Sequence, residues 1–226
     1  MIATKIVKLS FLAAALGLAI YFFKLRGVDM AKTRSDIPTV RLTLGDPISQ
    51  VQSQSSYDFK VKNFQDRHPL AIAEPVIFEY THPERRFTLP AAQFLWLSVY
   101  AQHVVDVKAS PHLEYLSLKE AHSLVQALIE IFDKAHWKRE PSDTPALDEL
   151  IEEFNDPATS SEHVVTIRKW RGGGDQIYIN LRRHWKAAEA LPQLSDEHKD
   201  LFTITVYIDN DSVYKKYNDA VNAKQR

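Results

Sequence analysis

The sequence predicts an α+β fold with a mainly antiparallel sheet. Its strand-like segments come in pairs joined by short turns, as in hairpins, whereas a parallel sheet would alternate strands with helices. One long amphipathic segment and shorter helical segments are expected to pack on this sheet. The chain has 226 residues, of which 45% are hydrophobic and 25% are charged, so it can bury a core of ordinary size. We expect residues 39–226 to form a single soluble domain.

Residues 1–26 predict an N-terminal membrane-anchor helix. An uncharged run at 9–23 is bounded on both sides by lysine or arginine. When Ile6, Val7 and Lys8 are added, with the Lys8 ammonium reaching the headgroups, a helix here spans about 27 Å, close to the hydrocarbon core of about 30 Å. A cleavable signal sequence is the alternative, because residues 17–19 (Gly-Leu-Ala) have the small residues of a cleavage site. A short N-terminus before one anchor favours a periplasmic soluble domain, although the flanking charges alone do not fix the orientation.

Polar residues 27–38 then predict a tether, and short strands follow it. Alternating apolar residues and apolar runs bounded by proline mark these strands. They are predicted at Val40–Leu44, Tyr57–Lys62, Val76–Tyr80, Phe94–Tyr100 and Val104–Lys108, with the last two forming a hairpin.

The strongest helix signal begins at Ser117. Ser117 and Glu120 form a Ser-x-x-Glu capping box, and apolar residues continue at helical spacing over Leu118–Ala135. This helix is expected to end near His136 and to be the central element of the core. A second, shorter helix is predicted over Thr144–Phe154.

A second hairpin is predicted around the glycines at 172–174. These glycines indicate a turn with positive φ, because a phosphate-binding P-loop would need a lysine and a following helix. The strands of this hairpin are predicted at Val164–Trp170 and Gln176–Trp185, and they are followed by a strand at Phe202–Ile208 and a final helix capped by Asp211 or Ser212.

Composition and spacing exclude several chemistries. The absence of cysteine excludes disulfides, iron–sulfur clusters, thiol catalysis and cysteine-bound zinc. The nine histidines form no recognised ligand pair, and no Gly-x-Ser-x-Gly elbow occurs. The second hairpin carries Trp170, Tyr178 and Trp185, which are residue types that stack nucleobases, but a net charge of −1 gives no general attraction for nucleic acid. We therefore expect no catalytic residues, no metal, no cofactor and no nucleic-acid partner.

One charge pattern exceeds the background. Residues 140–167 contain eight acidic residues and no lysine or arginine, whereas residues 168–186 are mainly basic. The acidic side chains of the shorter helix predict a docking surface for a basic partner. The predicted contact residues are Asp148, Glu149, Glu152 and Glu153. The alternative is a solvated helix face that the basic hairpin partly neutralises.

The layout of the chain also resembles a known family. Residues 110–121 (SPHLEYLSLKEA) lead into the long helix, residues 132–137 (FDKAHW) end it, and a hairpin and the strand Phe202–Asp209 follow. Over residues 93–210, together with the N-terminal anchor, this arrangement resembles the membrane-anchored or periplasmic immunity proteins of bacterial type VI secretion systems, notably those that guard against lipase effectors. His136 departs from the resemblance, since a glycine is expected before the tryptophan.

The resemblance implies a protein without catalytic activity. Such a protein binds a cognate toxin, for which a phospholipase is one candidate, in the periplasm and blocks it by non-covalent occlusion. Its partners would be this toxin and, through the N-terminal helix, the inner membrane. The alternative function is a structural or accessory component of a cell-envelope secretion assembly.

We expect a chain that begins near Ser35 to fold without the N-terminal segment, because the polar tether offers almost no apolar surface to couple the two parts. It should elute as one species in size-exclusion chromatography and unfold in one cooperative thermal transition. Persistent aggregation of this shortened chain would contradict the expectation.

Overall fold

Seven strands form the larger of two sheets, and all neighbouring strands in it are antiparallel. The computed structural model describes residues 37–59, 68–141, 164–184 and 201–224, which belong to one compact unit. In spatial order the strands of the large sheet are β2 (His68–Ile72), β5 (Phe94–Tyr100), β6 (His103–Ser110), β10 (Phe202–Asp209), β9 (Asp175–Arg183), β8 (Val164–Gly172) and β7 (Lys138–Arg139).

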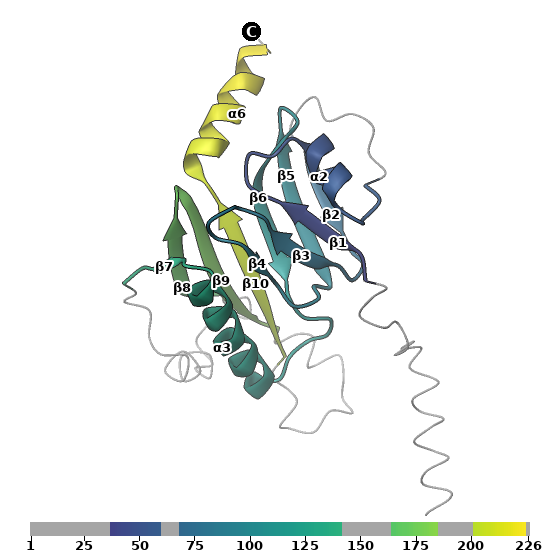
Figure 1. Cartoon of the computed structure of the whole chain (residues 1–226). Coiled ribbons are helices and arrows are strands. Elements are labelled where there is room, and N and C mark those ends of the chain that lie inside the picture. Colours follow the sequence, from purple (N-terminus) through teal and green to yellow (C-terminus); the bar gives the residue numbers. More distant parts are fainter. Residues whose placement is uncertain (1–36, 60–67, 142–163, 185–200, 225–226) are drawn as a thin grey trace, which may run out of the picture. The chain divides into compact units, whose positions relative to one another are not determined.

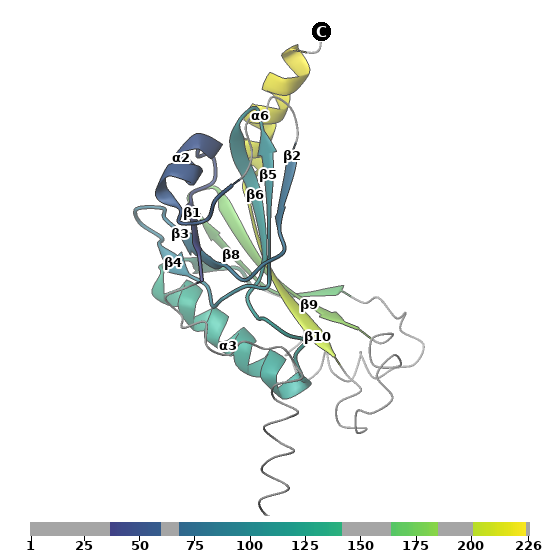
Figure 2. The same cartoon turned by 90° about the vertical axis from the view of Figure 1, so that its right-hand side faces the viewer.

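A smaller sheet lies on one side of the large one, and the long helix lies on the same side (Figure 2). The small sheet contains β1 (Thr39–Leu42), β3 (Ile77–Tyr80) and β4 (Phe87–Thr88), of which β1 and β3 are parallel. The described helices are α2 (Ile48–Gln54), α3 (Leu118–Lys134) and α6 (Asp211–Lys224). Figure 1 shows α6 continuing from the end of β10. The predicted α+β fold with mainly antiparallel sheets is confirmed.

Alternation along the strands builds the core between the two layers. Leu95, Leu97 and Val99 of β5 are fully buried, and so are the inward residues of β9 at positions 177, 179 and 181. In a strand, successive side chains point to opposite faces, so each of these strands presents its polar residues to the other side of the sheet. Both predicted hairpins are confirmed, as β5–β6 and β8–β9.

Helix α3 covers the large sheet as predicted. Ser117 caps its first turn, and Glu120 completes the capping box by accepting from the Ser117 amide at 2.8 Å. One face buries alanine, valine, leucine and phenylalanine side chains. The Phe132 ring lies 5.0 Å from Phe87 of β4 and 5.0 Å from Trp170 of β8, so this helix joins the two sheets.

Helix α3 ends in a Schellman motif at His136. The amide of His136 donates to the carbonyl of Asp133, and the amide of Trp137 donates to the carbonyl of Phe132. His136 has a φ of 62°, which is the left-handed conformation that usually selects glycine. The glycine expected before the tryptophan is thus absent at a position where the backbone would favour it.

Two local predictions differ from the structure, and four described elements, α2, β2, β4 and β7, were not predicted. The strand predicted at Tyr57–Lys62 is wrong for residues 57–59, which pair with no strand although Phe59 is buried. Helix α2 was not predicted, because only two of its seven residues, Ile48 and Val51, are buried apolar residues. The cap of α6 is neither Asp211 nor Ser212 but Asn210, whose Oδ1 accepts from the amides of Ser212 and Val213 at 3.0 Å.

The predicted membrane anchor at residues 1–26 lies outside the described residues, as does the predicted helix Thr144–Phe154. None of the described helices is long and apolar enough to cross a membrane.

Replacing Leu128 tests the central role of α3. Leu128 is fully buried, so Leu128→Ala should lower the free energy of unfolding by about 2–5 kcal/mol through lost burial and a residual cavity. Leu113 is 48% exposed, and Leu113→Ala is the control, with an expected change within about 0.5 kcal/mol. Urea unfolding measures both, and a loss below about 1 kcal/mol for Leu128→Ala would contradict the assigned core.

Candidate functional site

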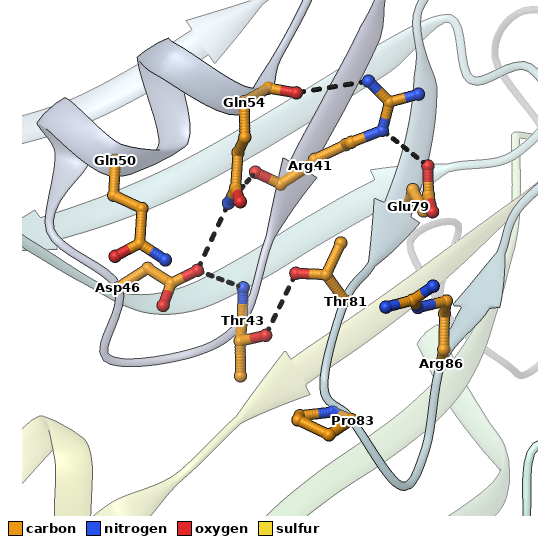
Figure 3. Close-up of a pocket in the computed structure, with 9 residues that line it drawn as sticks. All are labelled: Arg41, Thr43, Asp46, Gln50, Gln54, Glu79, Thr81, Pro83 and Arg86. Atoms are coloured by element: carbon orange, nitrogen blue, oxygen red, sulfur yellow. Dashed lines mark hydrogen bonds and ion pairs between the residues drawn. The ribbon is translucent and has the colours of Figure 1, made fainter.

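An open polar groove lies where β1, α2 and β3 meet (Figure 3). Its volume is about 580 Å³. It is lined by Arg41, Thr43, Asp46, Gln50, Gln54, Glu79, Thr81, Pro83 and Arg86.

Most polar groups in this groove bond to one another. The Arg41 Nε donates to the Glu79 carboxylate at 2.8 Å, and its Nη1 donates to the Gln54 carbonyl at 3.2 Å. The Asp46 carboxylate accepts from the Thr43 amide at 2.8 Å. Arg86 is exposed and has no hydrogen bond or ion pair with the rest of the described chain. The groove therefore joins three elements and leaves one guanidinium at its rim.

The segment after α2 also bonds along β1. The Thr39 amide donates to the Ser56 hydroxyl at 2.8 Å, and the Ser56 amide donates to the Thr39 carbonyl at 2.9 Å. The Arg41 amide donates to the Ser55 hydroxyl at 3.0 Å, and the Gln54 Nε2 donates to the Arg41 carbonyl at 2.9 Å. These bonds satisfy the amide and carbonyl groups of β1 that β3 does not reach.

The outward face of the large sheet carries a different kind of surface. Five adjacent strands each place one residue in the same cross-strand row, which is Trp96, Lys108, Tyr207, Tyr178 and Lys169. We call these residues the aromatic–lysine row. The Lys108 ammonium lies 4.8 Å from the centre of the Tyr207 ring, and the Lys169 ammonium lies 5.4 Å from that of Tyr178. The two tyrosine rings meet edge to face at 6.3 Å.

No described helix or strand packs over this row. Helix α3 and the small sheet lie on the opposite side of the large sheet (Figure 2). The three aromatic rings of the row are partly exposed, and Lys169 is exposed. Each ammonium group lies over a tyrosine ring, and such cation–π contacts contribute about 0.5–1 kcal/mol at exposed sites.

A pair of carboxylates lies next to this row. Asp106 and Asp209 are directly opposite each other on β6 and β10, on the same face as Lys108 and Tyr207. One oxygen of each carboxylate, Oδ1, is buried without a hydrogen-bond partner. Like charges directly opposite each other destabilise a sheet, so the Asp106–Asp209 pair lowers the stability of the fold when both carboxylates are ionised.

The same environment changes the pKa values of both acids. Burial raises the pKa of Asp106, against the opposing effects of Ser98 and Lys108. Burial, with the charges of Asp211, Asp106 and Asp175, raises the pKa of Asp209 to about 6. Asp209 is therefore partly protonated near neutral pH in the folded protein.

Sequence reasoning placed the binding residues elsewhere. The predicted contact residues Asp148, Glu149, Glu152 and Glu153 lie outside the described residues, so their role stays a prediction. Of the three aromatic residues noted in the second hairpin, Trp170 is fully buried and donates to Asp133 at 3.0 Å, which removes it from any stacking surface. Tyr178 belongs to the aromatic–lysine row, and Trp185 lies outside the described residues.

The row could have been noticed in part from the sequence. Trp96 and Tyr207 alternate with buried aliphatic residues in their strands, which already assigns them to the outward face. Their alignment across five strands depends on the register, which the sequence does not provide. The described residues contain no group of three or more acidic or histidine side chains that could hold a metal ion.

No protein-family model matches this chain, no curated protein is significantly similar to it, and no solved structure matches its fold.

Asp209→Asn tests the strain in the carboxylate pair. The pKa of Asp209 is about 6 in the folded protein, whereas the ordinary pKa of an aspartate, taken for the unfolded chain, is 3.8. Because the folded state binds the proton more tightly, this group lowers the free energy of unfolding as the pH rises from about 4 to about 6. The amide carries no charge, so the variant should be more stable than the wild type by about 1 kcal/mol at pH 8 and equal to it near pH 4.

Asp58→Asn is the control, because Asp58 is exposed, and it should change stability by less than about 0.5 kcal/mol at both pH values. Chemical denaturation at pH 4 and pH 8 measures all three proteins. An equal gain at the two pH values would mean that packing, and not charge, explains the effect.

Proposed function

We propose that this protein is an immunity protein that binds a cognate antibacterial toxin and neutralises it by non-covalent occlusion. The aromatic–lysine row forms the centre of the proposed contact surface. The row itself carries the proposal, since five neighbouring strands each contribute an aromatic or lysine side chain to one row on the outward face of the large sheet.

The residue types of this face suit protein recognition. Tryptophan and tyrosine dominate the energetic centres of protein interfaces, because they bury a large area at a small cost in side-chain entropy. Here Trp96, Tyr178 and Tyr207 are already held by their neighbours in the sheet, which reduces the ordering cost of binding.

The carboxylate pair adds a complementary charge site. A lysine or arginine of the partner placed over Asp106 and Asp209 would supply the opposite charge that the free protein lacks there. The acidic side chains predicted as contact residues are proposed to attract a basic partner as well, namely Asp148, Glu149, Glu152 and Glu153.

The sequence supports the proposed location. The uncharged run at 9–23 is suited to a single inner-membrane anchor, with the soluble domain in the periplasm. The resemblance to immunity proteins points to a toxin delivered by a type VI secretion system, with a phospholipase as one candidate for its activity.

A competition assay between sister cells tests this function and does not require the toxin to be identified. A strain that lacks this gene, grown in contact with its parent, should be killed, and the full-length wild-type protein should restore its survival. Trp96→Ala/Tyr178→Ala should restore less than about one tenth of that survival, because loss of two interface aromatics typically weakens binding by more than tenfold.

Tyr115→Ala is the matched control, because Tyr115 is an aromatic residue that is 50% exposed and lies outside the row. It should protect as well as the wild type. Far-UV circular dichroism and immunoblotting check that all variants are folded and equally abundant.

The possible outcomes separate the function from the surface. Full protection by the double variant would exclude the row from the interface. Survival of the gene-deleted strain without complementation, in contact with a parent whose secretion system is active, would reject the immunity function. An envelope defect in that strain when it is grown alone would then favour the alternative role in a secretion assembly.

A further inference from the structure

A second pocket lies around the glycine turn that joins β8 to β9. Its volume is about 490 Å³, within the range of small-molecule sites. Three of its walls carry a cationic side chain, namely Arg85 from the β3–β4 connection, Lys138 from β7 and Arg171 from β8. The fourth is the turn at Gly173 and Gly174, both with positive φ, whose amides make no hydrogen bond with the described chain.

Arg85 lies flat across this turn. Its side chain is 12% exposed, and a Cβ on Gly172 or Gly173 would overlap it. Its guanidinium carbon lies 5.8 Å from the centre of the Trp137 ring, and its Nη2 is 3.0 Å from the Nε2 of His82. Because these glycines have no Cβ, the mostly buried Arg85 guanidinium can pack directly against the turn.

Unpartnered donors gather in this corner of the fold. Among the described residues, the buried side-chain nitrogens without a hydrogen-bond partner are the Nε of Arg85 and the Nε1 of Trp137. Each buried donor without an acceptor costs free energy, and of the two side chains that of Arg85 belongs to a residue that lines the pocket. Lys138 is exposed and has no ion-pair partner within the described chain.

The carboxylates near the pocket are already engaged. Both oxygens of Asp175 accept hydrogen bonds within the fold, from the Tyr80 hydroxyl at 2.5 Å and from the Asn210 Nδ2 at 2.6 Å. Glu140 pairs with Arg171, and Glu84, which is 77% exposed, lies 3.2 Å from Arg85. A guanidinium has five N–H donors, so Arg85 and Arg171 keep donors for a further anion.

His136 is a further residue of this pocket. Its backbone adopts the left-handed conformation, at a φ of 62°, because it follows the end of α3 in the Schellman motif. A residue with a Cβ pays about 1 kcal/mol there relative to glycine.

We propose that this pocket binds a phosphate group, as the free ion or as a small phosphate ester. Two arginines, one lysine and a turn with two free amides line one pocket from separate segments, and so many donors suit a tetrahedral anion with many acceptors better than a planar carboxylate. The volume leaves room for an organic substituent on the phosphate. This site is separate from the aromatic–lysine row and does not depend on the immunity function.

Isothermal titration of the full-length protein in detergent tests the proposal, at pH 7.5 and constant ionic strength. The probes are inorganic phosphate, glycerol 3-phosphate and acetate. We expect saturable binding of a phosphate probe and a dissociation constant for acetate that is at least about tenfold higher.

Lys138→Gln/Arg171→Gln should weaken phosphate binding by about tenfold or more, because it removes two charge-assisted contacts. The matched control is Lys134→Gln/Arg182→Gln, which removes the same two charge types at exposed positions outside the pocket, and it should change binding by less than about twofold. Thermal unfolding checks that both double variants are folded.

The results decide between the site and general charge attraction. No saturable binding of either phosphate probe up to about 20 mM, equal losses in the two double variants, or acetate binding as tight as phosphate binding would each overturn the proposal. Tighter binding of glycerol 3-phosphate than of inorganic phosphate would assign the ligand as an ester, and equal binding would assign it as the free ion.

Discussion

The buried carboxylate of Asp175 connects the parts of this fold. Asp175 starts β9, Tyr80 ends β3 in the small sheet, and Asn210 caps α6, so two hydrogen bonds to one carboxylate join both layers and the last helix. Asp175 is 6% exposed, and a charge at that depth is tolerated only when its oxygens are satisfied. Burial and the Asp175 charge raise the pKa of Tyr80, so the phenol keeps the proton that it donates. The fold therefore depends on this polar contact as well as on its apolar core.

Local patterns in the sequence predict a large part of this architecture, and long-range pairing accounts for what they miss. The α3 capping box and both hairpins are encoded within short segments, so periodicity and turn residues reveal them. The parallel pairing of β1 with β3 joins segments separated by a helix and a strand, and nothing in either segment specifies it. Asn210 was missed as a cap because Asp211 and Ser212 are equally good capping residues, and only the geometry distinguishes them.

The candidate sites were less predictable than the fold, because each collects residues from distant segments. The aromatic–lysine row needs the register of five strands, and the pocket at the glycine turn needs Arg85, which belongs to a connection far from the hairpin in sequence. Among the described residues, the buried side-chain atoms without a hydrogen-bond partner form two groups in different places. The nitrogen donors lie near the glycine turn, whereas the carboxylate oxygens lie on the outward face of the large sheet. In the register of the sheet, Gln176 stands between Arg171 and Asp209, so this surface changes from positive to negative over neighbouring strands.

The bonds of residues 54–56 to β1 bear on how a partner can attach. An edge strand with free amides and carbonyls invites another chain to add a strand by backbone pairing. In this fold, the groups of β1 are bonded to Gln54, Ser55 and Ser56. In the outer strand β2, Pro69 has no amide proton to donate. The remaining outer strands, β4 and β7, have only two residues each. Within the described chain, β-augmentation is therefore disfavoured at the outer strands of both sheets. Recognition of the proposed toxin would then depend on side chains, and a few substitutions on one face could exchange one partner for another while the backbone stays unchanged.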